Sequence, residues 1–264
     1  MLDLKKVKKF SEQLAFKVGN YLVTSQNKVK IKAYKDRQDI VTNVDLEAEK
    51  RIIKAISKNY PQHNIQSEEI GFIDNKSLYT WVIDPLDGTK EYARGLATFN
   101  LNISLETAAK TILGLVYVPK TKEMFSAIDK FQAWENNMKI NVSQTKKLKD
   151  SFIYCHLPSY KMEKKKAKLT WQKLAKISKK CYRLRSFQAD VLSACWVAKG
   201  AVDGYILFSQ MEKWWDIAAG ILIVQEAGGM VTTLTGKPFK KSLLKKGMLV
   251  TNGKIHQQLL NLIN

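Results

Sequence analysis

The sequence is poor in cysteine, proline and long apolar runs. Its three cysteines, Cys155, Cys181 and Cys195, are odd in number and have no CxxC spacing, which argues against a disulfide framework or a zinc site. No uncharged apolar run reaches the roughly 18 to 20 residues that span a bilayer, and the N-terminus lacks the apolar segment of a secretory signal. We therefore expect a cytoplasmic protein with no membrane partner.

Arginine is also scarce, and this affects how the charge is interpreted. Lysine and arginine total 44 against 24 acidic residues, a formal net charge of +20, yet only five of the basic residues are arginine. Arginine is the side chain that recognises phosphates and bases in a bidentate manner. The densest basic stretch, 139–185, holds fifteen basic residues against two acidic ones, but few arginine and aromatic residues are interleaved with its lysines. We therefore do not expect nucleic acid as a partner.

The apolar residues that are present make up 45% of 264 positions, enough for a substantial core. Periodicity and end signals predict helices at 4–22, from 42 or 43 to just before 61, 161–180, 191–199 and 217–227. Strands are predicted at 79–83, 100–105, 112–118, 123–128, 230–233 and 248–251, the first of them ended by Asp84-Pro85. This alternation predicts a layered α+β sandwich, one compact unit with halves 1–140 and 141–264.

Three acidic segments lie where the chain changes direction: Ser67-Glu68-Glu69, Asp84-Pro85-Leu86-Asp87-Gly88-Thr89 and Trp214-Trp215-Asp216. In the middle segment, the turn at Pro85 brings Asp84 and Asp87 to the same side. Two such carboxylates repel unless a cation lies between them, and oxygen ligands suit Mg²⁺ or Mn²⁺. Gly88 and Thr89 can open a helix whose N–H groups bind an anion. The segment therefore indicates metal-assisted phosphoryl chemistry.

Each acidic segment by itself has a simpler explanation. Asp-Pro-x-Asp-Gly is common in turns, and Glu68-Glu69 is an ordinary exposed pair. Asp216 could cap a helix that begins at Ile217, and Asp45 could be a first-turn helix acid. The functional interpretation depends on their joint occurrence in one order.

That order resembles the inositol monophosphatase superfamily of metal-dependent, lithium-sensitive phosphatases. The matching segments extend over nearly the whole chain and are Asp39 to Asp45, Glu68-Glu69, Trp81 to Thr89, Trp215 to Gly220 and Glu226 to Gly229. The resemblance implies an αβαβα sandwich. It also implies Mg²⁺-dependent hydrolysis of a phosphomonoester of a small molecule, an inositol or sugar phosphate.

The resemblance further implies roles for individual residues around two or three metal ions, Mg²⁺ or alternatively Mn²⁺. The implied metal ligands are Glu68, Asp84, the backbone carbonyl of Leu86, Asp87 and Asp216. Thr89, paired with Asp45, would orient the attacking water, and Glu69 would contribute to a third, weaker ion. Backbone N–H groups of Gly88 and Thr89 would hold the phosphate.

Substrate choice is left open because two parts of the sequence disagree. The segments 89–92 and 99–103 resemble the 3′(2′),5′-bisphosphate nucleotidase branch, whereas 201–205 resembles inositol or sugar phosphatases. Gln188-Ala189-Asp190 replaces the Gly-Ser/Thr-Ala that is usual in the family. With Ala189 beside it, Asp190 could accept substrate hydroxyls, or it could cap the helix that begins at Val191.

A different class of function is also considered, in which the chain is a catalytically silent relative with a regulatory or RNA-binding role. The sequence contains all the implied metal ligands, which favours the enzyme. A homodimer is left open.

Overall fold

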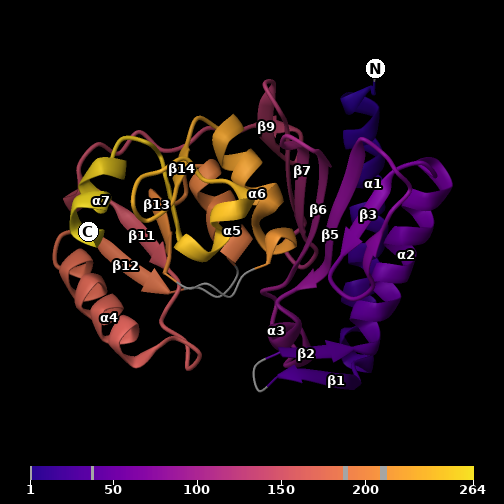
Figure 1. Cartoon of the computed structure of the whole chain (residues 1–264), viewed down its shortest axis with the longest axis horizontal. Coiled ribbons are helices and arrows are strands. Elements are labelled where there is room, and N and C mark those ends of the chain that lie inside the picture. The colour runs from indigo at the N-terminus through magenta and orange to yellow at the C-terminus, as the bar shows by residue number, and fades with distance from the viewer. Residues whose placement is uncertain (1, 37–38, 187–189, 209–212) are drawn as a thin grey trace.

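The computed structural model describes residues 2–36, 39–186, 190–208 and 213–264, except for the side chain of Asp190. Helices and strands alternate in layers (Figure 1). The principal helices are α1 (Leu4–Ser25), α2 (Asn43–Asn59), α3 (Thr89–Ala93), α4 (Lys164–Ser178), α5 (Asp190–Ala198), α6 (Trp214–Glu226) and α7 (His256–Ile263). Within these described ranges, no helix is long and apolar enough to cross a membrane.

The larger sheet lies in the first half of the chain and follows the order β10-β9-β8-β7-β6-β5-β3-β4. Its neighbours are antiparallel except for the parallel pair β3 and β5. Helices α1 and α2 cover one face and α6 covers the other (Figure 1). The strands are β3 (Asn64–Ser67), β4 (Gly71–Ile73), β5 (Tyr79–Asp87), β6 (Asn100–Thr107), β7 (Thr111–Val118), β8 (Glu123–Ile128), β9 (Gln132–Glu135) and β10 (Met138–Lys139).

The smaller sheet lies in the second half and follows the order β12-β11-β13-β15-β14. Helix α5 packs beside α6 between the two sheets, while α4 and α7 lie on the outer side (Figure 1). The described elements therefore form α, β, α, β and α layers, as the resemblance implies. The strands are β11 (Phe152–Cys155), β12 (Arg183–Ser186), β13 (Gly204–Leu207), β14 (Met230–Thr232) and β15 (Met248–Thr251).

Beside these layers, β1 (Ile31–Asp36) and β2 (Asp39–Thr42) form an antiparallel hairpin next to α3. The sequence did not predict β1. Its residues are almost all exposed, so it has no alternation of buried and exposed side chains that could reveal a strand. The hairpin delivers the chain to the start of α2.

Local capping explains where the first two helices begin. The Asp3 side chain accepts a hydrogen bond from the Lys5 amide, 3.0 Å away, at the start of α1. Thr42 and Asp45 form a reciprocal capping box at the start of α2, which decides between Thr42 and Asn43 as the cap. Both helices then bury an apolar face against the larger sheet.

Two predicted boundaries next to the acidic segments are wrong. Strand β5 does not end at Asp84-Pro85 but continues to Asp87, because Pro85 lies where the register with β6 shifts and no ladder hydrogen bond is needed from its nitrogen. Helix α6 begins at Trp214 rather than at Ile217, so Asp216 is a helical residue and not the cap. The predicted C-terminal end is confirmed, since Gly228 has a positive φ of 85°.

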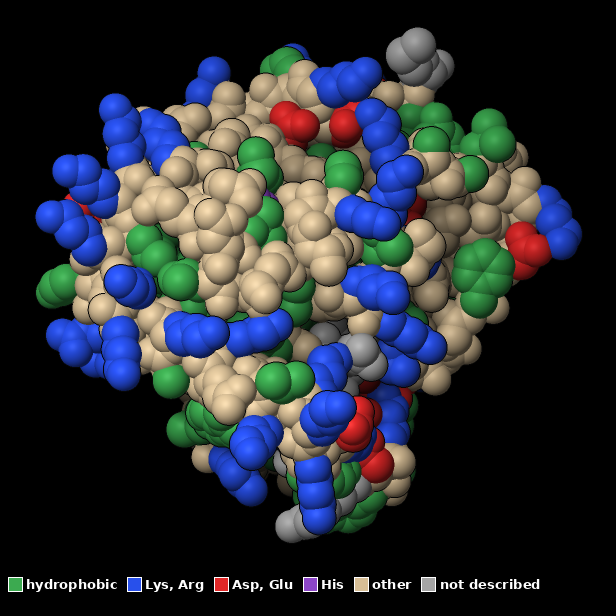
Figure 2. Space-filling model, turned by 60° about the vertical axis from the view of Figure 1, so that its left-hand side comes forward, with side chains coloured by type: hydrophobic (Ala, Val, Ile, Leu, Met, Phe, Trp, Pro, Cys, Tyr) green, Lys and Arg blue, Asp and Glu red, His purple; other side chains and the backbone are tan. Residues whose placement is uncertain are grey.

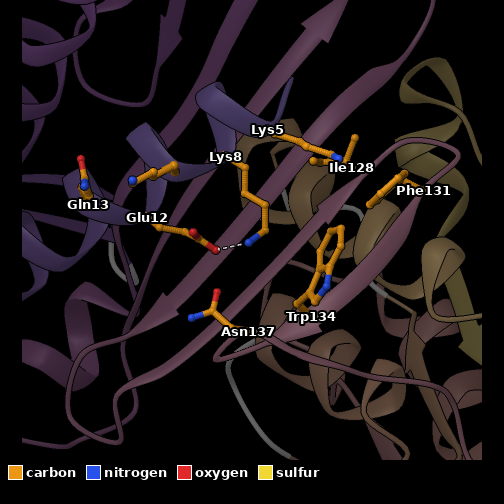
Figure 3. Close-up of a pocket in the computed structure, with 9 residues that line it drawn as sticks. Lys5, Lys8, Glu12, Gln13, Ile128, Phe131, Trp134 and Asn137 are labelled. Atoms are coloured by element: carbon orange, nitrogen blue, oxygen red, sulfur yellow. Dashed lines mark hydrogen bonds and ion pairs between the residues drawn. The ribbon is translucent and has the colours of Figure 1, made fainter. Parts of the chain in front are cut away.

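A surface pocket of about 560 Å³ lies between α1 and the β8–β9 region (Figure 3). The Lys8 ammonium lies 4.9 Å from the centre of the Trp134 ring and 2.6 Å from a Glu12 oxygen. Glu12 is the acidic residue of this lining, so the pocket does not coincide with the three acidic segments.

Candidate active site

Asp84 lies at the centre of the acidic residues. Its side chain is only 2% exposed on β5, and its Oδ1 accepts a hydrogen bond from the Leu86 amide at 3.0 Å. Burial raises its pKa well above the usual value, and the charges of Glu68, Asp87 and Asp216 raise it further. Segments far apart in sequence thus bring four carboxylates into one electrostatic neighbourhood.

Asp87 ends β5 and faces the start of β6. The Asn100 amide donates to its Oδ2 at 3.1 Å. Burial nevertheless raises the pKa of Asp87 to about 6. The Asn100 Oδ1 atom is buried without a hydrogen-bond partner among the described residues. Buried polar atoms are normally paired, so this corner of the site is suited to a polar ligand.

Glu68 and Glu69 follow β3, and a buried carboxylate fixes the backbone beneath them. Glu49, on α2, accepts from the Ser67 hydroxyl, the Glu69 amide at 3.0 Å and the Ile70 amide at 3.3 Å. Glu49 is not among the residues that the sequence indicated for the site. Its position four residues after Asp45 and three before Ile52, on the buried face, could have indicated an inward role.

Lys35, on β1, neutralises the same pair of acids. Its Nζ lies 3.0 Å from Glu68 Oε1 and 2.7 Å from Glu69 Oε1. Burial raises the pKa of both carboxyls, while Lys35 opposes that shift. Sequence reasoning missed Lys35 because nothing local distinguishes it among so many lysines.

Asp45 and Thr89 form a preorganised pair. The Thr89 hydroxyl lies 2.8 Å from Asp45 Oδ1 and 2.9 Å from the Leu86 carbonyl oxygen. A hydroxyl has one proton, so it donates to one of these acceptors at a time. The other Asp45 oxygen is held by the backbone and hydroxyl of Thr42. The acid that caps α2 therefore also orients Thr89.

Gly88 lets the chain turn from β5 into α3. It has a positive φ of 86°, and a Cβ at this position would lie 2.9 Å from the Thr98 carbonyl oxygen. Only glycine meets both conditions without strain. The predicted opening of a helix at Thr89 is confirmed, although α3 has only five residues.

Asp216 reaches the same region from the second half of the chain. It is the third residue of α6, and its Oδ2 accepts a hydrogen bond from the Lys213 amide at 2.5 Å. The charge of Asp216 raises the pKa of Asp84, so the two carboxylates are close enough to interact. The N-terminal turn of α6 thus faces the end of β5.

The remaining candidates fall at the edge of the described region. Ala189 lies outside the described residues. Asp190 is the first residue of α5, and its side chain is also outside the description. Their proposed contact with substrate stays a prediction.

The sequence model of the inositol monophosphatase family matches residues 3–264. The chain belongs to the inositol monophosphatase family. It is 37% identical to a protein of Pasteurella multocida described as Nus factor SuhB, over 87% of this chain and 84% of that protein. It is 32% identical to the fructose-1,6-bisphosphatase/inositol-1-monophosphatase of Thermotoga maritima, over 97% of this chain and 94% of that one.

Solved structures agree with this membership. The extragenic suppressor protein suhB of Bartonella henselae superimposes with a TM-score of 0.90 and 29% identity, covering 98% of each chain. The layered α+β architecture of the inositol monophosphatase family is therefore that of this chain.

The family is metal-dependent, and the donor set of this chain fits a hard divalent cation. The charges of three carboxylates act on the buried Asp84, and the buried Asn100 Oδ1 atom nearby, an acceptor, lacks a partner among the described residues. Within the described residues, no three acidic, histidine or cysteine side chains already surround one point. Glu68 is paired with Lys35, and Asp216 accepts a hydrogen bond from the Lys213 amide.

Proposed function

We propose that this member of the family is a metal-dependent phosphatase that hydrolyses a phosphomonoester of a small molecule. The observation that carries the proposal is the buried Asp84, surrounded by the charges of Glu68, Asp87 and Asp216. Keeping several carboxylates ionised at one buried place is unfavourable unless cations compensate them. The arrangement therefore suits a site that works with cations bound.

The proposed ligands of Mg²⁺, or alternatively Mn²⁺, are the five groups that the sequence indicated: Glu68, Asp84, the Leu86 carbonyl, Asp87 and Asp216. When bound, the ions would lower the pKa of water and neutralise charge on the phosphate and the leaving oxygen. Asp84 interacts with the charges of all three other acids, so we propose it as a ligand of both ions. Glu69 is proposed to help hold a third, weaker ion.

The chain itself would position the water and the phosphate. Thr89, held by Asp45, presents its hydroxyl oxygen at the end of β5 and would orient the attacking water. When Thr89 donates to Asp45, the Leu86 carbonyl is released for a cation. Backbone N–H groups of Gly88 and Thr89 would hold the phosphate during in-line displacement.

The substrate is proposed to be an inositol or sugar phosphate, and the alternative is a 3′(2′),5′-bisphosphate nucleotide. A relative that acts on fructose 1,6-bisphosphate and inositol 1-phosphate, as its description states, supports the first class. The feature of this chain that supports the nucleotide is Thr89-Lys90-Glu91-Tyr92. In either case the substrate is anionic and small.

The test is phosphate release from inositol 1-phosphate, fructose 1,6-bisphosphate and 3′-phosphoadenosine 5′-phosphate, with Mg²⁺ and after EDTA. We expect turnover of at least one compound, its loss after chelation, and inhibition by submillimolar to millimolar Li⁺. Undiminished turnover after chelation would contradict the metal mechanism. Full activity in tens of millimolar Li⁺ would contradict the proposed ligand set.

A second candidate function, binding of single-stranded RNA, is favoured by the surface of α4. Lys164, Lys168 and Trp171 follow one another at helical spacing, and the Trp171 side chain is 51% exposed. None of the lysines of α4 forms an ion pair with another described residue. Figure 2 brings the α4 side of the molecule forward, and basic side chains far outnumber acidic ones there.

Lysines around an exposed aromatic ring are the elements of a stacking platform for unpaired bases. Two relatives are described as Nus factors rather than by an enzymatic activity, which supports a function other than hydrolysis. The test is fluorescence anisotropy with a labelled single-stranded RNA at several salt concentrations. We expect Trp171→Ala to weaken binding by about tenfold, whereas Phe131→Ala, at an exposed ring on the far half, should not. If the unmodified protein and both variants bind RNA equally well, Trp171 does not stack on bases, and the binding is a general electrostatic attraction.

A further inference from the structure

Two acids of the site share one ammonium group. Lys35 Nζ lies within hydrogen-bond distance of both Glu68 Oε1 and Glu69 Oε1, at 3.0 and 2.7 Å. The Lys35 side chain is one-third exposed, at 33%, whereas that of Glu69 is almost completely buried. Glu68 also faces the negative charges of Asp39 and Asp45. Lys35 therefore supplies positive charge at a place where several acids would otherwise repel one another.

The backbone under these acids is fixed independently of Lys35. Glu49 holds the amides of Glu69 and Ile70 and the hydroxyl of Ser67, all from the buried side of the loop. Departure of Lys35 would thus leave the loop in place and free only the side chains of Glu68 and Glu69. The Asp36 carboxylate also pairs with Lys161, so the hairpin that carries Lys35 has a second attachment.

We propose that Lys35 is a built-in counter-ion that a divalent cation must displace, and that it thereby sets the cation concentration at which the site fills. The inference rests on the proposed function in taking Glu68 as a metal ligand. An ammonium group and a divalent cation repel when they share one carboxylate pair. Metal binding therefore exchanges the Lys35 hydrogen bonds for metal–oxygen contacts, and the lysine moves toward solvent, which its partial exposure allows.

The variant that tests this is Lys35→Gln, which removes the charge but keeps a polar side chain of similar reach. Its matched control is Lys32→Gln, an exposed lysine on the same strand that forms no ion pair with the acids of the Glu68–Glu69 loop. Lys35→Arg keeps the charge and is a second control. Circular dichroism establishes that each variant is folded.

The first measurement is Mg²⁺ binding by isothermal titration calorimetry in the absence of substrate. We expect Lys35→Gln to bind Mg²⁺ about tenfold more tightly than the unmodified protein, because the competing charge is gone. Lys32→Gln and Lys35→Arg should bind as the unmodified protein does or more weakly. Unchanged or weaker binding by Lys35→Gln would overturn the inference, since the lysine would then not compete with the ion.

The second measurement is thermal unfolding with EDTA and with saturating Mg²⁺. If Lys35 acts as the counter-ion, Lys35→Gln should unfold at a lower temperature in EDTA, where the two acids are uncompensated, and at the unmodified temperature in Mg²⁺. An equal loss in both conditions would show an ordinary structural role and overturn the inference. If the unmodified protein itself neither binds Mg²⁺ nor is stabilised by it, the proposed function fails as well, and the two failures are distinguishable.

Discussion

The end of β5 and the outer helix α4 both concentrate charge of one sign, but they do so in different environments. Asp84 is buried and the acids around it are partly buried, and burial together with the charges of these acids raises the pKa of Asp84. The lysines of α4 are mostly exposed and lie in water without ion pairs to other described residues. Charges without a counter-ion therefore destabilise the folded protein at the end of β5, whereas at α4 they have almost no effect on its stability. The cluster of acids around Asp84 therefore indicates a function that requires it. The lysines of α4 need no explanation beyond keeping the protein in solution.

The largest expected effect tests the buried side of this comparison. Asp84→Asn removes the central carboxylate, and we expect kcat to fall on the order of 10³-fold or more, because charge stabilisation at a closed site is lost. The unfolding temperature in EDTA should rise by about 2–4 °C for each kcal/mol of repulsion that is relieved. Phosphate release at saturating Mg²⁺ and thermal unfolding in EDTA measure the two effects. Asp150→Asn, at an exposed acid, is the control, and equal behaviour of the two variants would contradict the functional role of burial.

A smaller effect is expected at the Thr89–Asp45 pair, which binds no ion in the proposal. Thr89→Val keeps the shape of the side chain but loses the hydroxyl, and we expect kcat to fall about 10²-fold with little change in KM. Thr89→Ser keeps the hydroxyl and should retain most of the activity. Steady-state kinetics of both variants provide the test. Similar rates for valine and serine would show that the hydroxyl does not orient the attacking water.

How much of this could be foreseen depends on the range of the interactions. The sequence predicted α2 with a cap at Thr42 or Asn43, and the opening of α3 at Thr89, because local capping and glycine geometry determine both. The layered fold followed from ordered motifs that resemble the family. The end of β5 was misplaced, because the sequence does not show that β6 shifts its register at Pro85.

Lys35 and Glu49 could not be identified in the same way. Each interacts with the Glu68-Glu69 loop from a different element, at sequence separations of 33 residues for Lys35–Glu68 and 20 for Glu49–Glu69. One lysine among many has no local feature that indicates such a contact, and the position of Glu49 on α2 indicates only that it faces inward, not which loop it contacts. Tertiary packing, rather than propensity, selects them.

The second half of the chain has its own buried ionisable group, and this sharpens the comparison. The His256 ring lies between Thr232 and Thr251, 2.9 and 2.8 Å from their hydroxyl oxygens, and burial lowers its pKa to about 4. An unfolded histidine has a pKa near 6.5, so the unfolded chain binds the proton more tightly between these values. Stability is therefore present above about pH 6.5 and is lost as the pH falls toward 4.

We expect the lowered pKa of His256 to reduce the free energy of unfolding by about 2 kcal/mol as the pH falls from 7 to 5. His256→Gln cannot take up the proton, so its stability should fall less steeply over the same range. Urea unfolding at a series of pH values, in EDTA, measures the difference between the two proteins. Parallel pH profiles would show that His256 is protonated equally in the folded and unfolded chains.

The smallest effect is expected on the exposed side of the comparison. Lys164→Gln combined with Lys168→Gln removes two solvated charges that make no ion pair with other described residues, so unfolding temperature should change by no more than about 1 °C. Turnover should stay within about twofold, because screening at 0.15 M salt limits the reach of these charges to about 8 Å. Kinetic measurements at low and at physiological salt would show whether these lysines act on the substrate over a longer range. If kcat/KM for an anionic substrate falls in the variant only at low salt, the lysines of α4 steer the substrate toward β5, and the two charged regions act together rather than independently.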